Sequence, residues 1–187
     1  MKRFFSLLLI GIFLLLLIPT FSAESGCSAR GAVVMEACSE QTLFEQNPDL
    51  PLPEASTTKI MTALLVLESV QTDRRFRVSA KAATVEGSQL GLKAGEELSV
   101  KDLLYVLMMK SGNDAAVVLA EGVSGSEPAF VEKMNQKAAA LGLVQTHFKN
   151  PHGLPAEGHQ TTARELAKLT AAALENEDFR ALVSTQR

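Results

Sequence analysis

Apolar residues form two short runs early in the chain and then follow a helical period. Residues 32–35 and 42–44 are rich in apolar side chains and flank the polar stretch 38–41, which is typical of a β-hairpin. From Ser56 onward the apolar positions form a broad stripe at helical spacing, which predicts a central and largely buried helix. The stripe comprises Ile60, Met61, Leu64, Leu65 and Leu67.

Three more helices are expected between residues 99 and 141. Ser99 is a good N-cap, and the apolar residues that follow it fall on one helical face. Residues 111–113 break this helix. The next segment, 115–120, is apolar on every side, so we expect it to be buried. A further helix over about 127–141 carries its large apolar side chains on one side.

Turn-forming residues separate these helices from the rest of the chain. An irregular segment with a short strand at 76–78 precedes the first of them, and residues 150–153 form a turn cluster. Thr162 and Glu165 make a capping box that opens a last helix, which runs to about Leu174. The chain is therefore mostly helical with one hairpin. Because two strands alone are only marginally stable, its sheet looks incomplete.

The first 23 residues have the three-part layout of a secretory signal peptide. Lys2 and Arg3 form a basic start, an apolar run follows, and Pro19 breaks the run ahead of small residues. The run is shorter than the ~20 residues that a membrane span needs. We expect export, with cleavage near Ser22 or Ala23. Cleavage removes two basic residues and no acidic ones, so the formal net charge changes from −3 to −5.

The composition excludes several classes of protein. With 187 residues, 47% hydrophobic and 21% charged, the chain has the make-up of one globular domain rather than of a disordered protein. Net acidity, one tyrosine and no tryptophan argue against nucleic-acid binding. Two cysteines are too few for a disulfide scaffold or a Cys-rich zinc site. Whether Cys27 and Cys38 pair after export stays open.

Ser56 and Lys59 have the spacing of a nucleophile and its base. Residues three apart lie on one face of a helix, so the Lys59 amine can reach the Ser56 hydroxyl. A neutral lysine acts as a base when burial or a nearby cation lowers its pKa. The free N–H groups at a helix N-terminus also favour negative charge on an attacked carbonyl. The spacing alone fits an N-cap serine and a surface lysine at least as well.

Ser111 and Asn113 stand at the break between two apolar helices. Their residue types suit a helix-to-helix turn, and a Ser-x-Asn spacing by itself is weak evidence of function. Both this pair and the pair Ser56 and Lys59, however, lie at helix boundaries beside strongly apolar helices. We therefore expect the four side chains to converge in one cleft.

Six stretches, in order over nearly all of residues 28–187, resemble the low-molecular-mass penicillin-binding proteins, the serine D-alanyl-D-alanine carboxypeptidases of the cell wall. That family combines Ser-x-x-Lys with a second Ser-x-Asn motif and a third motif, Lys-Thr-Gly. The matching stretches are residues 28–30, 52–62, 87–89, 111–115, 148–154 and 162–167.

The resemblance implies a role for each candidate residue. Ser56 would attack the carbonyl between the two terminal D-alanines of a peptidoglycan stem peptide and form an acyl-enzyme, with Lys59 as proton acceptor. Ser111 would relay a proton toward the departing D-Ala nitrogen, and Asn113 would hydrogen-bond the substrate's peptide carbonyl. Water would then release the shortened peptide. The resemblance also implies no cofactor or metal, inhibition by β-lactam antibiotics, and a location in the periplasm or cell wall, or on the extracellular face.

The implied fold is α/β (α+β), β-lactamase/transpeptidase-like, with residues 24–187 forming an incomplete catalytic domain behind a signal peptide at 1–23. The family's Lys-Thr-Gly lies on a strand well downstream of the second motif, and it is absent from this sequence. Residues 110–112 spell Lys-Ser-Gly, but they overlap the second motif and follow a helix. We expect the carboxylate-binding residues, the second oxyanion donor and the C-terminal strands to be missing here. A C-terminal segment for peripheral membrane association would also lie outside this sequence. A lesser departure is Glu40, where the family usually has glycine.

Other classes fit the sequence less well. A class A β-lactamase would need a Glu-x-x-Leu-Asn segment, and an α/β-hydrolase would need Gly-x-Ser-x-Gly; both are absent. A zinc peptidase would need clustered ligands, but His147, His152 and His159 lie in a turn-rich stretch without His-Glu-x-x-His. We expect these histidines to stay outside the cleft. A wall-binding module with an inactive site remains the non-enzyme alternative.

Overall fold

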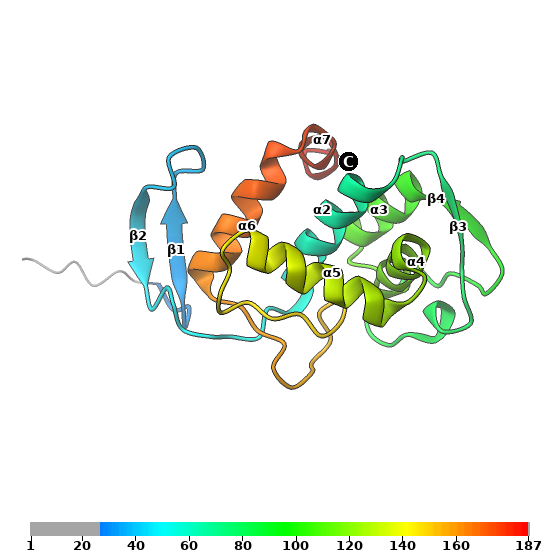
Figure 1. Cartoon of the computed structure of the whole chain (residues 1–187), viewed down its shortest axis with the longest axis horizontal. Coiled ribbons are helices and arrows are strands. Elements are labelled where there is room, and N and C mark those ends of the chain that lie inside the picture. The colour runs from blue at the N-terminus through cyan, green and yellow to red at the C-terminus, as the bar shows by residue number, and fades with distance from the viewer. Residues whose placement is uncertain (1–26, 187) are drawn as a thin grey trace, which may run out of the picture.

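The computed structural model describes residues 27–186, so the expected signal peptide lies outside the described residues. At one end of the molecule, β1 (Ala32–Met35) and β2 (Thr42–Gln46) form an antiparallel hairpin, as Figure 1 shows. Val34 pairs with Phe44, and the register shifts just after Val34. The predicted hairpin is confirmed. Within residues 27–186, β1 has β2 as its one strand partner.

The hairpin turn is organised by Glu36. Its carboxylate accepts hydrogen bonds from the Ser39 hydroxyl and from the backbone N–H groups of Ser39 and Cys38, and these bonds lower the pKa of Glu36 to about 2. Glu40 then adopts a φ of 54°, in the left-handed region that favours glycine. The backbone conformation at residue 40 thus explains why glycine is expected there. Cys27 and Cys38 are both free thiols.

Helix α2 (Lys59–Ser69) lies at the centre of the helical part and contacts α3, α4, α5, α6 and α7. Its residues from Met61 to Val66 are buried, which confirms the predicted central helix. The helix begins at Lys59 rather than at Ser56. Ser56 lies in a short 3-10 helix, η1 (Ala55–Thr58), that leads into α2.

Three helices pack around α2 as the pattern predicted. In α3 (Val100–Met109), the Ser99 hydroxyl caps the helix by accepting from the N–H of Asp102 at 3.0 Å. In α4 (Asn113–Ser124), residues 115–120 are buried on every side. In α5 (Glu127–Ala140), Phe130, Met134 and Ala138 form the buried face.

A second small sheet pairs β3 (Arg75–Arg77) antiparallel with β4 (Glu97–Ser99). The strand expected at 76–78 is present one residue earlier, and its partner β4 was not foreseen. Between them lie a short 3-10 helix, η2 (Ala82–Thr84), and an irregular segment that runs past the α3–α4 turn.

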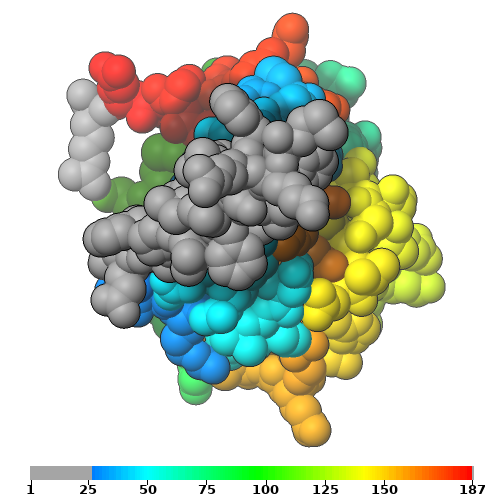
Figure 2. Space-filling model, turned by 90° about the vertical axis from the view of Figure 1, so that its left-hand side faces the viewer, coloured from blue at the N-terminus to red at the C-terminus, as the bar shows by residue number. Residues whose placement is uncertain are grey.

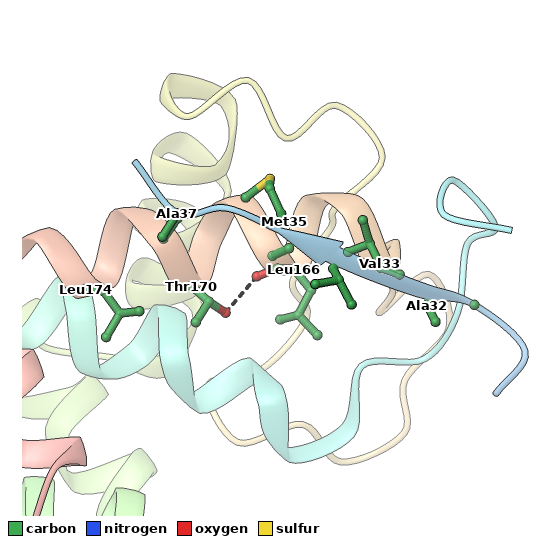
Figure 3. Close-up of a pocket in the computed structure, with 12 residues that line it drawn as sticks. Ala32, Val33, Met35, Ala37, Leu166, Thr170 and Leu174 are labelled. Carbon is green, nitrogen blue, oxygen red and sulfur yellow. Dashed lines mark hydrogen bonds between the residues drawn. The ribbon is translucent and has the colours of Figure 1, made fainter. Parts of the chain in front are cut away.

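The chain then returns to the hairpin with α6 (Ala163–Glu175), which packs against β1, and α7 (Glu177–Val183) follows, packed against α2, α3 and α6. Thr162 caps α6 by accepting from the N–H of Glu165, which confirms the Thr162 half of the predicted capping box. The Glu165 carboxylate binds the N–H of Gln145 and the Thr146 hydroxyl. Figure 3 shows β1 lying along α6. The cavity that β1 and α6 line has a volume of about 540 Å³.

Residues 141–162 form a long loop between α5 and α6. Backbone bridges join Leu52 to Thr161 and His147 to Gln160. In Figure 2 the chain around residue 50, in cyan, lies against this loop, in yellow and orange. Within residues 27–186, no helix has the length and apolar character to cross a membrane.

Candidate active site

Ser56 stands on a strained turn at the entrance to α2. Ala55, the residue before it, has a φ of 47°, which is unfavourable for any residue with a Cβ. The Ser56 hydroxyl lies 3.3 Å from Lys59 Nζ and accepts a hydrogen bond from the Ser111 hydroxyl at 3.0 Å. One serine oxygen is thus within reach of an amine and of a second hydroxyl.

Lys59 is buried in the first turn of α2, with 2% of its surface exposed. Its Nζ donates to Ser56 Oγ, to Asn113 Oδ1 at 2.8 Å and to the backbone carbonyl of His152 at 2.6 Å. Three acceptors match the three N–H bonds of an ammonium group. Burial nevertheless lowers the pKa of Lys59 to about 8, because it penalises the charged form. About a tenth of the amine is therefore neutral at pH 7.

The α3–α4 turn delivers Ser111 and Asn113 to the same place. Ser111 has a φ of 56°, and Asn113 is the first residue of α4. Asn113 Nδ2 donates to the carbonyl of Glu86 at 2.7 Å, and its N–H donates to the carbonyl of Ser88 at 2.7 Å. The amide therefore ties the loop around residue 88 to the amine of Lys59.

Asp114 is a buried residue of this site that the sequence did not single out. Its Oδ2 accepts the backbone N–H groups of Leu90, Gly91 and Leu92 at 2.9–3.1 Å. This carboxylate fastens the loop to the start of α4. The sequence offered one signal of this role. Asp114 is an acidic residue directly before a segment expected to be buried, and a buried carboxylate needs several hydrogen-bond donors.

The turn at residues 150–153 supplies the third acceptor for Lys59. Asn150 Oδ1 accepts from the N–H groups of His152 and Gly153, and Thr62 donates to the carbonyl of Pro151 at 2.7 Å. Gly153 has a φ of 91°, and a Cβ there would lie 1.9 Å from the carbonyl oxygen of Ala55. Glycine is thus required for the close approach of this turn to the backbone at Ala55 and Ser56.

The expectation that the histidines stay outside the cluster is wrong for His152. Its backbone carbonyl, rather than its ring, enters the cluster, and residue type gives no signal of such a contact. His147 is exposed, whereas His159 is buried against Thr58, with His159 Nε2 2.8 Å from Thr58 Oγ1. Among the described residues, no group of three potential ligands is placed to hold a metal ion.

The four predicted residues therefore come together beside a surface pocket of about 310 Å³. Ser56, Lys59 and Ser111 line it, together with Thr57, Ile60, Leu107 and Met108. The cavity beside β1 in Figure 3 contains none of the four. A serine at a helix entrance that contacts a buried lysine one turn later and a second serine has the arrangement of serine acyl-transfer sites of the Ser-x-x-Lys type.

Comparison with known proteins gives the family. A model of the D-alanyl-D-alanine carboxypeptidase family matches residues 19–186, and the chain belongs to this family of penicillin-binding proteins. It is 41% identical to D-alanyl-D-alanine carboxypeptidase DacF of Bacillus subtilis over 99% of this chain and 51% of that protein. With DacC of Escherichia coli the identity is 38%, over 86% and 44%. The chain thus spans about half the length of these curated relatives.

Solved structures share the fold. The D-alanyl-D-alanine carboxypeptidase DacD of Francisella tularensis superimposes with a TM-score of 0.80 at 36% identity, over 82% of this chain and 38% of that one. The D-alanyl-D-alanine carboxypeptidase of Mycobacterium tuberculosis gives 0.80 at 31% identity, over 84% and 60%. The fold is therefore of the β-lactamase/transpeptidase type that the motifs implied.

Proposed function

We propose that this chain carries the acylating part of a serine D-alanyl-D-alanine carboxypeptidase. The observation that carries the proposal is the pair of contacts to the Ser56 hydroxyl, from Lys59 Nζ at 3.3 Å and from Ser111 Oγ at 3.0 Å. These contacts provide a base and a proton relay at one nucleophile. The names of the relatives support the substrate class.

In the proposed reaction, neutral Lys59 takes the hydroxyl proton while Ser56 Oγ bonds to the carbonyl carbon between the two terminal D-alanines. The backbone N–H of Ser56 serves as one oxyanion donor. The C–N bond then breaks, and Ser111 passes a proton to the departing D-Ala nitrogen. Water attacks the remaining ester, which frees the shortened peptide and restores the Ser56 hydroxyl.

Asn113 serves two purposes in this proposal. Its Oδ1 holds the Lys59 amine, and one N–H of its Nδ2 binds Glu86. We assign the second N–H of Nδ2 to the peptide carbonyl of the substrate. A β-lactam resembles the D-Ala-D-Ala end and would acylate the same hydroxyl. The relatives cited above are carboxypeptidases, and none of them is named a β-lactamase.

Export is part of the proposal, because a stem peptide is reached only outside the cytoplasm. It is supported by the basic, apolar and small-residue layout of residues 1–23. We also propose that residues 24–187 make up an incomplete catalytic domain, since Lys-Thr-Gly is absent from them. N-terminal sequencing of material secreted by an expressing bacterium should begin near residue 23 or 24. A sequence that begins at Met1 would contradict export with cleavage.

The proposed reaction is tested by single-turnover release of D-alanine from diacetyl-Lys-D-Ala-D-Ala. We expect release of up to one equivalent per chain. Ser56→Ala should abolish it, and Ser28→Ala, at an exposed serine far from η1 in the sequence, should leave it unchanged. Release that persists in Ser56→Ala would overturn the proposed nucleophile.

A further inference from the structure

A buried carboxyl–imidazole pair lies beside the turn that carries Ser56, and the proposed reaction uses neither group. The side chains of Glu54 and His159 are 0% and 2% exposed, and Glu54 Oε1 lies 3.2 Å from His159 Nε2. The same nitrogen is 2.8 Å from the Thr58 hydroxyl. Glu54 precedes η1 and Thr58 is its last residue. Through Glu54 itself and through the contact of His159 with Thr58, the pair is therefore connected to both ends of η1, which we call the nucleophile turn.

Hydrogen bonding assigns the proton on His159. Its Nδ1 accepts the backbone N–H of Lys149 at 2.9 Å, so this nitrogen carries a lone pair. Burial lowers the pKa of His159 to about 4, so the ring is neutral at pH 7 and its single proton is on Nε2. The Nε2–H therefore faces Thr58 and Glu54.

The carboxyl group of Glu54 lacks the donors that a buried carboxylate needs. Among the described residues, neither oxygen has a well-aligned hydrogen bond, because the nearby Nε2–H points at Thr58. Burial raises the pKa of Glu54 to about 8, so the group keeps its proton at neutral pH.

Three titratable groups interact with His159. His147 and Lys149, on the chain segment before His159, lower its pKa further. His152 interacts with both His159 and Lys59, but burial lowers the pKa of His152 to about 4, so its ring is neutral at pH 7. None of these residues forms a hydrogen bond or an ion pair with the Glu54 carboxyl within residues 27–186. Ionisation of Glu54 would thus place a poorly solvated charge beside the turn.

The backbone links this carboxyl directly to the nucleophile. The Glu54 carbonyl accepts from the N–H of Thr57 at 3.2 Å and from its hydroxyl at 2.5 Å. A single residue, Ala55 at a φ of 47°, separates Glu54 from Ser56. Because this conformation persists only when its surroundings enforce it, displacement of the Glu54 side chain would relax the turn.

We propose that Glu54 and His159 are positioning residues for Ser56: the neutral Glu54 carboxyl stays buried beside the turn that carries Ser56, and its ionisation would draw it toward water and relax that turn. The proposal deepens the proposed function and rests on it for its kinetic consequence. On the alkaline side, two titrations then oppose each other. Loss of the Lys59 proton creates the base, and loss of the Glu54 proton misplaces the hydroxyl.

The first test measures acylation by a fluorescent penicillin from pH 6 to 9.5. In Glu54→Gln, a neutral isostere, we expect rates within about twofold of the wild type at pH 7 and about tenfold higher at pH 9, since each pH unit beyond a pKa changes ionisation tenfold. His159→Gln should weaken acylation at every pH. The matched control is Glu165→Gln, at a buried carboxyl whose donors are Gln145 and Thr146, and its profile should follow the wild type. Superimposable profiles for Glu54→Gln and the wild type would overturn the proposal.

A second test does not require acylation. In a Lys59→Gln background, which removes the amine, NMR should show the Ala55 and Ser56 amide signals titrating together with the Glu54 carboxyl carbon. Adding Glu54→Gln should abolish this movement. Amide signals that do not follow the carboxyl would overturn the positioning role. Coupled titration with no acylation of the wild-type chain at any pH would instead leave the positioning role intact and contradict the proposed function.

Discussion

Two opposing effects act on Lys59, and their balance determines its chemistry. Three oxygens accept its hydrogen bonds and stabilise the ammonium form, whereas removal from water favours the neutral amine. Burial lowers the pKa of Lys59 to about 8, because it disfavours the charged form. In its protonated form, Lys59 is therefore held in place by three hydrogen bonds, and its neutral fraction can accept a proton.

Acylation should accordingly depend on the ionisation of Lys59. Because the amine must lose its proton before it can accept one from Ser56, the rate should rise with pH between about 7 and 8. Lys59→Ala should lower the rate by ~10²–10⁴-fold, the usual contribution of a general base. Stopped-flow acylation by a chromogenic cephalosporin measures both effects. A rate independent of pH over this range would contradict the role of Lys59 as base.

Glu54 should make stability fall as the pH rises. Its pKa is raised from 4.5 to about 8 in the folded chain, so the folded state holds a proton that the unfolded state has already lost. The contribution is fully present below about pH 4.5 and is lost as the pH approaches 8. Urea unfolding at pH 5 and pH 8 should show a smaller decrease in Glu54→Gln than in the wild type. Equal decreases in the two proteins would contradict this account.

The sequence predicted the side-chain contacts that depend on helical spacing. It did not predict the contacts that depend on the path of the backbone through turns. One helical turn brings Lys59 to Ser56, and residue pattern shows this directly. The carbonyl of His152 and the close approach of Gly153 to Ala55 depend on a turn joined to α2 through Thr62, which no residue type announces. The same holds for the pairing of Glu54 with His159, 105 positions away in the sequence.

Among the structural elements, the turn at 150–153 supports η1 from outside. Gly153→Ala should displace the Ala55 carbonyl, because the added Cβ would lie 1.9 Å from it. The matched control is Gly142→Ala, at a similar φ of 71° with no atom within 4 Å. For this control, thermal unfolding should show about 1 kcal/mol of destabilisation, and penicillin acylation should show no loss.

Gly153→Ala should instead lose acylation by about 10²-fold, as expected when a reacting group moves by about an ångström. This loss should be seen under conditions where circular dichroism shows the chain still folded. Wild-type acylation in folded Gly153→Ala would show that the turn does not position Ser56.

Long elements were more predictable than short ones. The helices α2 to α6 follow from apolar periodicity and from caps such as Ser99 and Thr162. Strand β4 has three residues, too few for a period to show, and α7 has seven. Helix α7 begins where the Asn176 side chain accepts from the N–H of Phe179, a capping signal carried by one residue rather than by a periodic pattern.

At the scale of the whole molecule, we propose that the chain contributes one part of a divided site. It holds the proposed nucleophile, base and relay, and its sequence contains no Lys-Thr-Gly. In the described residues, β1 pairs with β2 alone and lies along the cavity against α6. A strand edge of this kind favours pairing with further strands or aggregation.

We therefore expect residues 24–187 alone to be a poor carboxypeptidase. Loss of one oxyanion donor costs ~10²–10³-fold in rate, and we expect the carboxylate-binding group to be absent from these residues as well. The comparison protein is a chimera that appends the C-terminal half of the Bacillus subtilis relative. Steady-state D-alanine release should be at least ~10²-fold faster in the chimera. Equal, Ser56-dependent turnover in both proteins would contradict the division of the site.

The central claim is that the hydroxyl of Ser56 is the acylated nucleophile. Mass spectrometry of the chain after exposure to benzylpenicillin, with proteolytic mapping, tests it most directly. We predict one penicilloyl adduct, on the peptide that contains Ser56, formed faster at pH 8 than at pH 7 and absent from Ser56→Ala. An adduct on any other residue, or one that persists in Ser56→Ala, would contradict the account.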